Sequence, residues 1–420
     1  MIPRVRGTRD FLDLTLVTFA TETIKKHLKK YHFQEIMTPI LEPVALFKRS
    51  LGLETDVVSK EMFVVSSSSV EKGDEEICLR PEATASVVRA FVENGIQTLP
   101  WKVFLSGPMF RYERPQKGRY REFFQCSLEI IGAQSLMHDV QVMTMLDRLF
   151  RAEFKLEVYA LHINFLGCPA DRLTFKELLG IFLDTHAEKL CATCIKRRHS
   201  NILRVLDCKN PDCQELYTKA PQLTDSLCTV CATEWQSVQH RLEELAVPFV
   251  HMPRLVRGLD YYNKTVFEFV SPLLGAQSTF CGGGRYDHLV EQIGGKEDQP
   301  SVGAAIGLDR LVLMLETIKD SLPLPFDPAL FVILPLSAEQ HPLALQVTDA
   351  LIRAGLQTEL LLDGSVKSMM RKADKHGAKA VIFIGADEQS AGTVKVKLLQ
   401  TGAESTVKQI DLSSHLKLLK

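Results

Sequence analysis

The sequence predicts an α+β protein with an antiparallel sheet, flanking helices, a helical insertion and a separate C-terminal α/β domain. Three observations lead to this fold class: a hairpin pattern over residues 101–132, a helical, cysteine-bearing stretch over residues 168–246, and a proline-rich segment at residues 322–328. With 420 residues, the chain is long enough for two or three domains that each bury a core.

Composition and charge are those of an ordinary globular protein. Hydrophobic residues make up 45% of the chain, and 50 Lys and Arg face 51 Asp and Glu, so a nucleic-acid ligand would need a locally basic surface. The N-terminal residues lack the apolar core of a signal peptide, and no apolar run approaches the roughly 18 residues that cross a bilayer. We therefore expect a cytoplasmic protein with no membrane partner.

Apolar periodicity defines the elements of the first part, residues 1–167. It predicts an amphipathic helix over residues 11–31, strand-like sequence from Glu35, the hairpin, and a helical run over residues 138–154. The second strand of the hairpin has two unlike faces. One face bears Phe123, Gln125, Ser127 and Glu129, and the other bears Phe124, Cys126, Leu128 and Ile130. A strand so apolar on one side is expected to be central in its sheet.

The hairpin loop, residues 114–121, holds four cations and an aromatic residue. Planar guanidinium groups bind phosphate oxygens bidentately and balance the charge that develops in phosphoryl or nucleotidyl transfer, so the loop suits a polyphosphate substrate. The alternative interpretation is a solvated hairpin with a charged tip.

Residues 168–246 differ from their flanks and are predicted to form an inserted module. Strand-like sequence returns at residues 254–270 and 279–283, and an apolar helix begins near Leu308, so residues 247–321 would complete the interrupted domain. Arg310 is expected in the first turn of that helix. A cation there opposes the helix dipole, and small residues precede it, which favours a ligand-binding arginine over one that extends into solvent.

Residues 322–328 are predicted to be a linker, and residues 329–420 a separate domain with partly parallel strands. In this last part, apolar strands alternate with helical patterns in a βαβαβ order, with strands at 329–334, 358–362 and 380–384 and helices at 338–354 and 366–377.

Several motifs resemble those of the class II aminoacyl-tRNA synthetases. SGPMFRYERPQKGRYREFFQ (106–125) resembles motif 2, MTP (37–39) motif 1, GAAIGLDR (303–310) motif 3, and LRPEAT (79–84) an amino-acid-binding element. RGLDYY (257–262) and GGGRYD (282–287) resemble blocks specific to the histidyl-tRNA synthetases. The resemblance covers nearly the whole chain, and it implies the class II antiparallel sheet, of six to seven strands, and a C-terminal anticodon-binding domain.

The resemblance also implies roles for individual residues. Histidine would be bound by Glu82, Thr84, Gln125, Glu129, Tyr261, Tyr262 and Tyr286, with Glu129 and Tyr262 on either side of the imidazole. ATP would be bound by Arg111, Glu113, Arg119, Phe123 and Arg310. Arg257 and Arg111 are the expected catalytic residues, since Arg257 would stabilise the transition state as the carboxylate attacks and pyrophosphate leaves. ATP with Mg²⁺, L-histidine and tRNA(His) are the expected ligands, and a homodimer the expected assembly.

Six cysteines cluster between residues 191 and 231. Two Cys-x-x-Cys pairs, Cys191 with Cys194 and Cys228 with Cys231, have the spacing of a zinc site. Either Cys208 or Cys213, which lie between the pairs, could replace one of the four ligands, and reduced cysteines that merely pack are the alternative.

Two rival functions concern the whole chain. A non-catalytic relative, such as a synthetase-like regulatory subunit or a sensor domain, would typically lose catalytic residues and the C-terminal domain, whereas this chain keeps Arg111, Arg257, Arg310 and a complete C-terminal pattern. A synthetase for another amino acid would lack the block at residues 257–262. Histidine–tRNA ligase activity is therefore the expected function.

Overall fold

The protein, described here from a computed structural model, forms two compact units, Met1–Leu324 and Pro325–Lys420. The structure describes residues 2–52, 55–66, 76–324 and 328–419, so residues 325–327 of the predicted linker lie outside the described part. Within the described residues, no helix has the length and apolar character needed to cross a bilayer.

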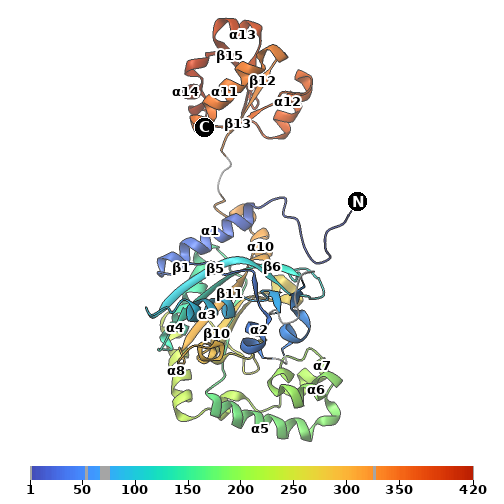
Figure 1. Ribbon diagram of the computed structural model, residues 1–420, viewed down its shortest axis with the longest axis vertical. Helices are drawn as coiled ribbons and strands as arrows, with labels where there is room; N and C mark the ends of the chain where they lie inside the picture. The colour runs from blue at the N-terminus through green and yellow to red at the C-terminus, as the bar shows by residue number, and fades with distance from the viewer. Residues whose placement is uncertain (1, 53–54, 67–75, 325–327, 420) are drawn as a thin grey trace. The chain divides into compact units, whose positions relative to one another are not determined.

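A large mixed sheet forms the centre of the first unit (Figure 1). Among the described residues it has eight strands, so the expected number of six to seven was too low. The six inner strands are antiparallel, whereas the two short edge strands pair parallel with their neighbours. In sheet order, the strands are β1 (Gln34–Glu35), β5 (Trp101–Phe110), β6 (Glu122–Ile131), β11 (Ser301–Gly307), β10 (Thr279–Arg285), β9 (Asn263–Val270), β7 (Ala160–Phe165) and β8 (Val250–His251).

The apolar face of β6 lies against the larger core, as its alternation predicts. Cys126, Leu128 and Ile130 are buried there together with apolar side chains of four helices: α1 (Thr15–Lys30), α4 (Met137–Arg148), α8 (Thr229–Glu244) and α10 (Leu308–Glu316). Figure 1 shows α1 and α10 on one side of the sheet and α2 (Val44–Leu51) and α3 (Thr84–Glu93) on the other. Because β6 pairs with β5 and β11, it is a central strand. The opposite face of β6 is therefore enclosed between layers, where a polar site can be shielded from water.

The inserted segment is helical, with α5 (Pro169–Thr185), α6 (Ala192–Ser200) and α7 (Pro211–Tyr217) followed by α8. Apolar side chains of this segment, among them Phe175 and Leu179, join the second core of the unit, which also contains α2, α3 and α9 (Leu289–Ile293). A small sheet, in the order β2 (Leu41–Pro43), β4 (Ile77–Leu79) and β3 (Phe63–Val65), lies in the same unit.

The prediction of strand-like sequence from Arg254 was wrong for residues 254–262. The strand β9 begins only at Asn263, and the preceding residues form a loop. The side chain of Asn164 donates hydrogen bonds to the carbonyls of Pro253 and Leu255, at 3.1 and 2.9 Å. A buried amide, rather than a strand partner, thus satisfies the backbone at the start of this loop.

The second unit has the βαβαβ order that the sequence predicts. Its sheet has the order β13 (Gln357–Leu360), β12 (Leu330–Pro335), β14 (Ala380–Ile384), β15 (Thr393–Leu398) and β16 (Glu404–Lys408). The first three strands are mutually parallel, and the last two are antiparallel to their neighbours. The connecting helices are α11 (His341–Arg353) and α12 (Val366–Lys375), and α13 (Ala386–Ala391) and α14 (Leu412–Lys417) complete the unit.

A buried ion pair fixes α4 to the end of β10. Arg285 is 2% exposed, and its Nε donates to both carboxylate oxygens of Asp139, at 3.1 Å each. Its two terminal nitrogens donate to the carbonyls of Ala133 and Ser135 and to the carboxylates of Asp139 and Asp287. All five N–H groups of the guanidinium therefore have acceptors, which is what allows a full charge to lie inside the fold.

We expect Asp139→Ala to lower the free energy of unfolding of the first unit by about 3–5 kcal/mol, because it removes the buried carboxylate that pairs with Nε and one terminal nitrogen of Arg285 and leaves Asp287 as the remaining carboxylate partner. Urea unfolding followed by tryptophan fluorescence measures this unit, since both tryptophans, Trp101 and Trp235, belong to it. The matched control is Asp10→Ala, which removes the exposed Arg4–Asp10 pair and should cost less than about 1 kcal/mol. Equal effects of the two substitutions would contradict the structural role of the buried pair.

Candidate active site

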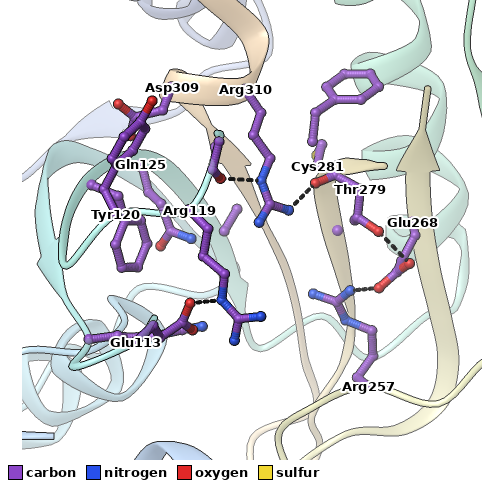
Figure 2. Close-up of a pocket in the computed structure, with 17 residues that line it drawn as sticks. Glu113, Arg119, Tyr120, Gln125, Arg257, Glu268, Thr279, Cys281, Asp309 and Arg310 are labelled. Atoms are coloured by element: carbon purple, nitrogen blue, oxygen red, sulfur yellow. Dashed lines mark hydrogen bonds and ion pairs between the residues drawn. The ribbon is translucent and has the colours of Figure 1, made fainter. Parts of the chain in front are cut away.

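A cavity of about 300 Å³ lies over the polar face of the central strands. We call it the arginine pocket. Its floor comes from β6, β10 and β11, and its walls from the hairpin loop, the loop before β9 and the first turn of α10 (Figure 2). Its charged, polar and aromatic lining residues include Arg111, Glu113, Arg119, Phe123, Gln125, Arg257, Glu268, Thr279, Asp309 and Arg310.

Four arginines reach this pocket from four different parts of the chain. Arg111 follows β5, and Arg119 lies in the hairpin loop, as the sequence suggests. Arg257 comes from the loop before β9, and Arg310 lies in the first turn of α10. In Figure 2 the guanidinium groups of Arg119, Arg257 and Arg310 extend into the same space. Such an array is suited to bind a ligand with several negative charges.

Carboxylates balance only part of this charge. Arg119 is ion-paired with Glu113, and Arg257 with Glu268. The third carboxylate of the lining, Asp309, is paired with Arg9 and accepts a hydrogen bond from the backbone N–H of Phe124 at 2.7 Å. Arg111 and Arg310 thus retain positive charge for which the described lining supplies no paired carboxylate.

Arg310 shows the consequence of this imbalance. Its Nε donates to the carbonyl of Gly118 at 2.9 Å, and one terminal nitrogen donates to Oε1 of Gln277 at 3.0 Å. Burial, together with the charges of Arg119 and Arg111, lowers the pKa of Arg310 to about 10. An anion bound here would stabilise the charged form of Arg310, and the arginine would in turn stabilise the bound anion.

Arg257 has the opposite environment. Its burial opposes the charge, but the adjacent Glu268 carboxylate, together with Tyr262 and Tyr261, outweighs this effect, and the pKa of Arg257 is raised. Thr279 donates its hydroxyl to the same carboxylate at 2.8 Å and so orients it. Gly282 leaves the necessary room, because a Cβ at this position would lie 2.7 Å from Nη1 of Arg257.

A second polar group, the Glu129 cluster, comprises Glu82, Thr84, Glu129, Tyr261, Tyr262 and Tyr286, which were all expected to bind histidine. The carboxyl group of Glu129 accepts the hydroxyl of Thr84 at 2.7 Å and that of Tyr286. The ring of Tyr261 lies between its neighbours, with centroids 4.5 Å from Tyr262 and 5.7 Å from Tyr286. The structure therefore brings these predicted residues together, including segments 177 or more residues apart in the chain, such as Thr84 and Tyr261.

Two residues connect the cluster to its surroundings. The carboxylate of Glu82 accepts the backbone N–H groups of Thr84 and Ala85, both at 2.8 Å, and so caps the start of α3. Gln125, four residues before Glu129 on β6, lines the arginine pocket. Because alternate residues share a strand face, the arginine pocket and the Glu129 cluster lie along the same face of β6.

Three residues of the site were not anticipated: Glu268, Thr279 and Asp309. Glu268 could have been noticed, because it is the one acidic residue in the otherwise largely apolar segment that forms β9. Thr279 and Asp309 gave no comparable signal. Their contacts to Glu268 and Arg9 depend on how distant segments pair.

The structure does not gather the four predicted metal ligands, Cys191, Cys194, Cys228 and Cys231, into one group of the described residues. Each Cys-x-x-Cys pair lies at the start of its own helix, and the two helix starts belong to different groups of ligand atoms. The structure instead assembles Cys191, Cys194, Cys208 and Cys213 in one group, and Cys168, Asp171, Cys228 and Cys231 in another.

The raised pKa of the buried Glu129 should make the free energy of unfolding depend on pH. Burial raises the pKa of Glu129 from its ordinary 4.5 to about 8, although hydrogen bonds from Tyr286 and Thr84 favour the anion. Between these two values the folded state binds more protons than the unfolded state, so the stability of the wild type falls as the pH rises and then levels off. Glu129→Gln imitates the protonated side chain and lacks this dependence.

We therefore expect the difference in free energy of unfolding, Glu129→Gln minus wild type, to increase with pH up to about 8, by at most about 1.4 kcal/mol per pH unit. Urea unfolding at a series of pH values measures it. Ser127→Ala, on the same strand face, is the matched control and should keep the pH dependence of the wild type. A constant difference across the series would show that Glu129 titrates in its ordinary range.

The family model described as histidyl-tRNA synthetase matches residues 14–311, and that described as anticodon binding domain matches residues 331–419. Histidine–tRNA ligase of Solidesulfovibrio magneticus is 44% identical over 99% of this chain and 97% of the relative, and that of Synechococcus sp. is 42% identical over 99% of both chains.

Solved structures agree with these matches. The apo structure of S. aureus histidyl-tRNA synthetase has a TM-score of 0.80 and 31% identity, with 99% of this chain and 100% of that one covered. An ATP phosphoribosyltransferase regulatory subunit/histidyl-tRNA synthetase from Bacillus halodurans has a TM-score of 0.64 and 18% identity, over 92% of this chain and 99% of that one, and so shares the fold. The chain belongs to the histidyl-tRNA synthetase family of aminoacyl-tRNA ligases, with the class II fold and a C-terminal anticodon-binding domain.

Proposed function

We propose that this chain activates L-histidine with ATP and transfers the histidyl group to tRNA(His), with the arginine pocket as the ATP site and the Glu129 cluster as the histidine site. One observation supports this most directly: four arginines meet at a pocket that shares the polar face of β6 with a buried cluster of carboxyl and tyrosyl groups. The first set suits the phosphates of ATP, and the second suits a small polar amino acid.

In this proposal ATP binds with its phosphates among Arg111, Arg119 and Arg310. The guanidinium group of Arg111 lies 5.4 Å from the ring centroid of Phe123, and its Nε donates to the carbonyl of Pro81 at 2.9 Å, so its direction is fixed before the ligand arrives. Mg²⁺ enters with ATP as part of the substrate. It prefers oxygen ligands, and the carboxylates of Glu113 and Glu268 on the lining fit that preference.

Histidine offers an ammonium group and an imidazole with two nitrogens. We place the imidazole against Glu129 and Tyr262, with Tyr286 closing the pocket and Tyr261 beside it. Glu82, Thr84 and Gln125 are then available to the ammonium group. Buried polar partners of this kind discriminate strongly, because a different amino acid would leave them without hydrogen bonds.

The reaction needs no covalent bond to the protein. A carboxylate oxygen of histidine attacks the α-phosphorus of ATP. The bond between this phosphorus and the oxygen that bridges to the β-phosphate breaks, and pyrophosphate leaves with the bonding electrons. Arg257 and Arg111 would stabilise the negative charge that grows on the α-phosphate. A hydroxyl of the tRNA then attacks the carbonyl carbon of the adenylate, and AMP leaves. Positioning and fixed positive charge therefore supply the catalysis.

The assembly and location of the protein form part of the same proposal. We propose a homodimer that works in the cytoplasm, with catalytic residues 1–167 and 247–321 interrupted by the module at residues 168–246. After the linker at residues 322–328, residues 329–420 would read the anticodon of tRNA(His). The regulatory alternative has less support, since Arg111, Arg257 and Arg310 are all present and meet at one pocket.

Replacing Arg257 tests the catalytic assignment. We expect Arg257→Ala to lower histidine-dependent pyrophosphate exchange about 10²-fold, equivalent to roughly 3 kcal/mol, with histidine affinity largely retained. Arg254→Ala is the matched control, because Arg254 lies three positions away and donates to the carbonyl and side-chain oxygens of Gln214, outside the pocket. Exchange by Arg257→Ala within a few-fold of that control would remove Arg257 from the mechanism.

Truncation tests the role of the second unit. A chain that ends at Leu324 should keep histidine-dependent pyrophosphate exchange, because every residue of the proposed ATP and histidine sites lies before that point. Its KM for tRNA in aminoacylation should rise sharply. The dimer must be verified by light scattering, and the full chain is the control. Unchanged charging of tRNA by a dimeric truncated protein would refute the assignment of residues 329–420.

A further inference from the structure

The inserted segment gathers seven cysteines and one aspartate into two compact groups, neither of which the proposed reaction uses. The thiol group comprises Cys191, Cys194, Cys208 and Cys213, and the mixed group comprises Cys168, Asp171, Cys228 and Cys231. Within each group, one ligand atom from every residue lies within 4.8 Å of the others. All ten cysteines lie in the described part of the chain and are free thiols.

The spacing of the thiol group fits a metal rather than a disulfide. Sγ of Cys191 lies 3.7 Å from Sγ of Cys208. A Zn–S bond of about 2.3 Å in a tetrahedron places neighbouring sulfurs about 3.8 Å apart, whereas bonded sulfurs lie about 2.05 Å apart. Zinc favours four thiolates in this geometry.

Backbone N–H groups also point at these sulfurs. The N–H of Cys191 donates to Sγ of Cys213 at 3.3 Å, and the N–H of Asn210 donates to Sγ of Cys208 at 3.4 Å. The ligand atoms of metal sites are themselves commonly held by such hydrogen bonds from the surrounding protein. Cys194, Cys208 and Cys213 are buried, so thiolates here need a cation to offset the loss of water.

The mixed group joins the first helix of the module to its last helix. Cys168 and Asp171 lie at the start of α5, and Cys228 and Cys231 at the start of α8. The carboxylate of Asp171 accepts the backbone N–H of Cys168 at 3.0 Å and that of Cys228 at 2.9 Å. Asp171 is therefore held in place beside Cys168 and Cys228, and a carboxylate oxygen is an ordinary zinc ligand.

We propose that the inserted module binds two structural zinc ions, one through Cys191, Cys194, Cys208 and Cys213, and the other through Cys168, Asp171, Cys228 and Cys231. The first fastens the start of α6 to the segment around α7. The second fastens the start of α5 to the start of α8. A small helical module gains most from such cross-links.

Metal analysis of the full-length, untagged protein, purified without added metal or chelator, tests the proposal. We expect elemental mass spectrometry to find two zinc ions per chain. X-ray absorption at the zinc edge should find seven sulfurs and one oxygen for each pair of ions, which follows from four thiolates in one site and three with a carboxylate in the other. Zinc at the level of a protein-free blank, with all ten thiols titratable after gentle unfolding, would overturn both sites, and iron in place of zinc would overturn the identity of the metal.

Matched variants separate the two sites. Cys194→Ser with Cys213→Ser should lower the content by one ion, and so should Cys231→Ser, whereas Cys78→Ser, a buried cysteine outside both groups, should keep two. Asp171→Cys should also keep two ions and replace the oxygen signal by an eighth sulfur. One ion per chain in the wild type, lost in only one set of variants, would overturn the site whose variants have no effect. Circular dichroism checks that each variant is folded. The X-ray absorption data on the wild type test the ligand sets even if a variant does not fold.

Discussion

Glycines on the polar face of β10 and β11 are the constraint on which the site depends. A Cβ at Gly303 would lie 1.7 Å from a carboxylate oxygen of Glu129, and one at Gly282 would lie 2.7 Å from Nη1 of Arg257. Any larger residue at these positions would displace Glu129 or Arg257. The two strands thus form a flat floor, and Arg257 and Glu129 lie where side chains of the sheet would otherwise be.

The same enclosure shifts the pKa values of charged groups in the site toward their neutral forms. Burial raises the pKa of Glu129 to about 8, and burial with neighbouring cations lowers that of Arg310 to about 10. Both groups are thus held in environments that disfavour their charged forms. A polyanion beside Arg310 and a ligand with N–H donors beside Glu129 would each relieve the conflict. Binding of substrates and stability of the empty site are therefore coupled.

The inserted module takes part in this arrangement from outside the pocket. Arg172, the residue after Asp171, donates to the carbonyl of Tyr262 at 3.0 Å. Asn201 donates to both carboxylate oxygens of Asp260, at 3.0 and 3.1 Å. Residues 257–262 form a loop rather than a strand, so these contacts from α5 and the end of α6 help to hold Arg257 and Tyr262. The order of the module and the shape of the site are physically linked.

The sequence alone determined which face each residue of β6 takes, the position of Arg310 in the first turn of α10 and the βαβαβ order of the second unit, because periodicity and turn residues act locally along the chain. It also identified most of the residues that gather at the site, by their likeness to known motifs. Only the tertiary structure decided that Glu268 pairs with Arg257, that Arg285 holds α4 through Asp139, and that the cysteines divide into two groups. Each of these depends on which distant segments pack together, and contacts of that kind leave no period in the sequence.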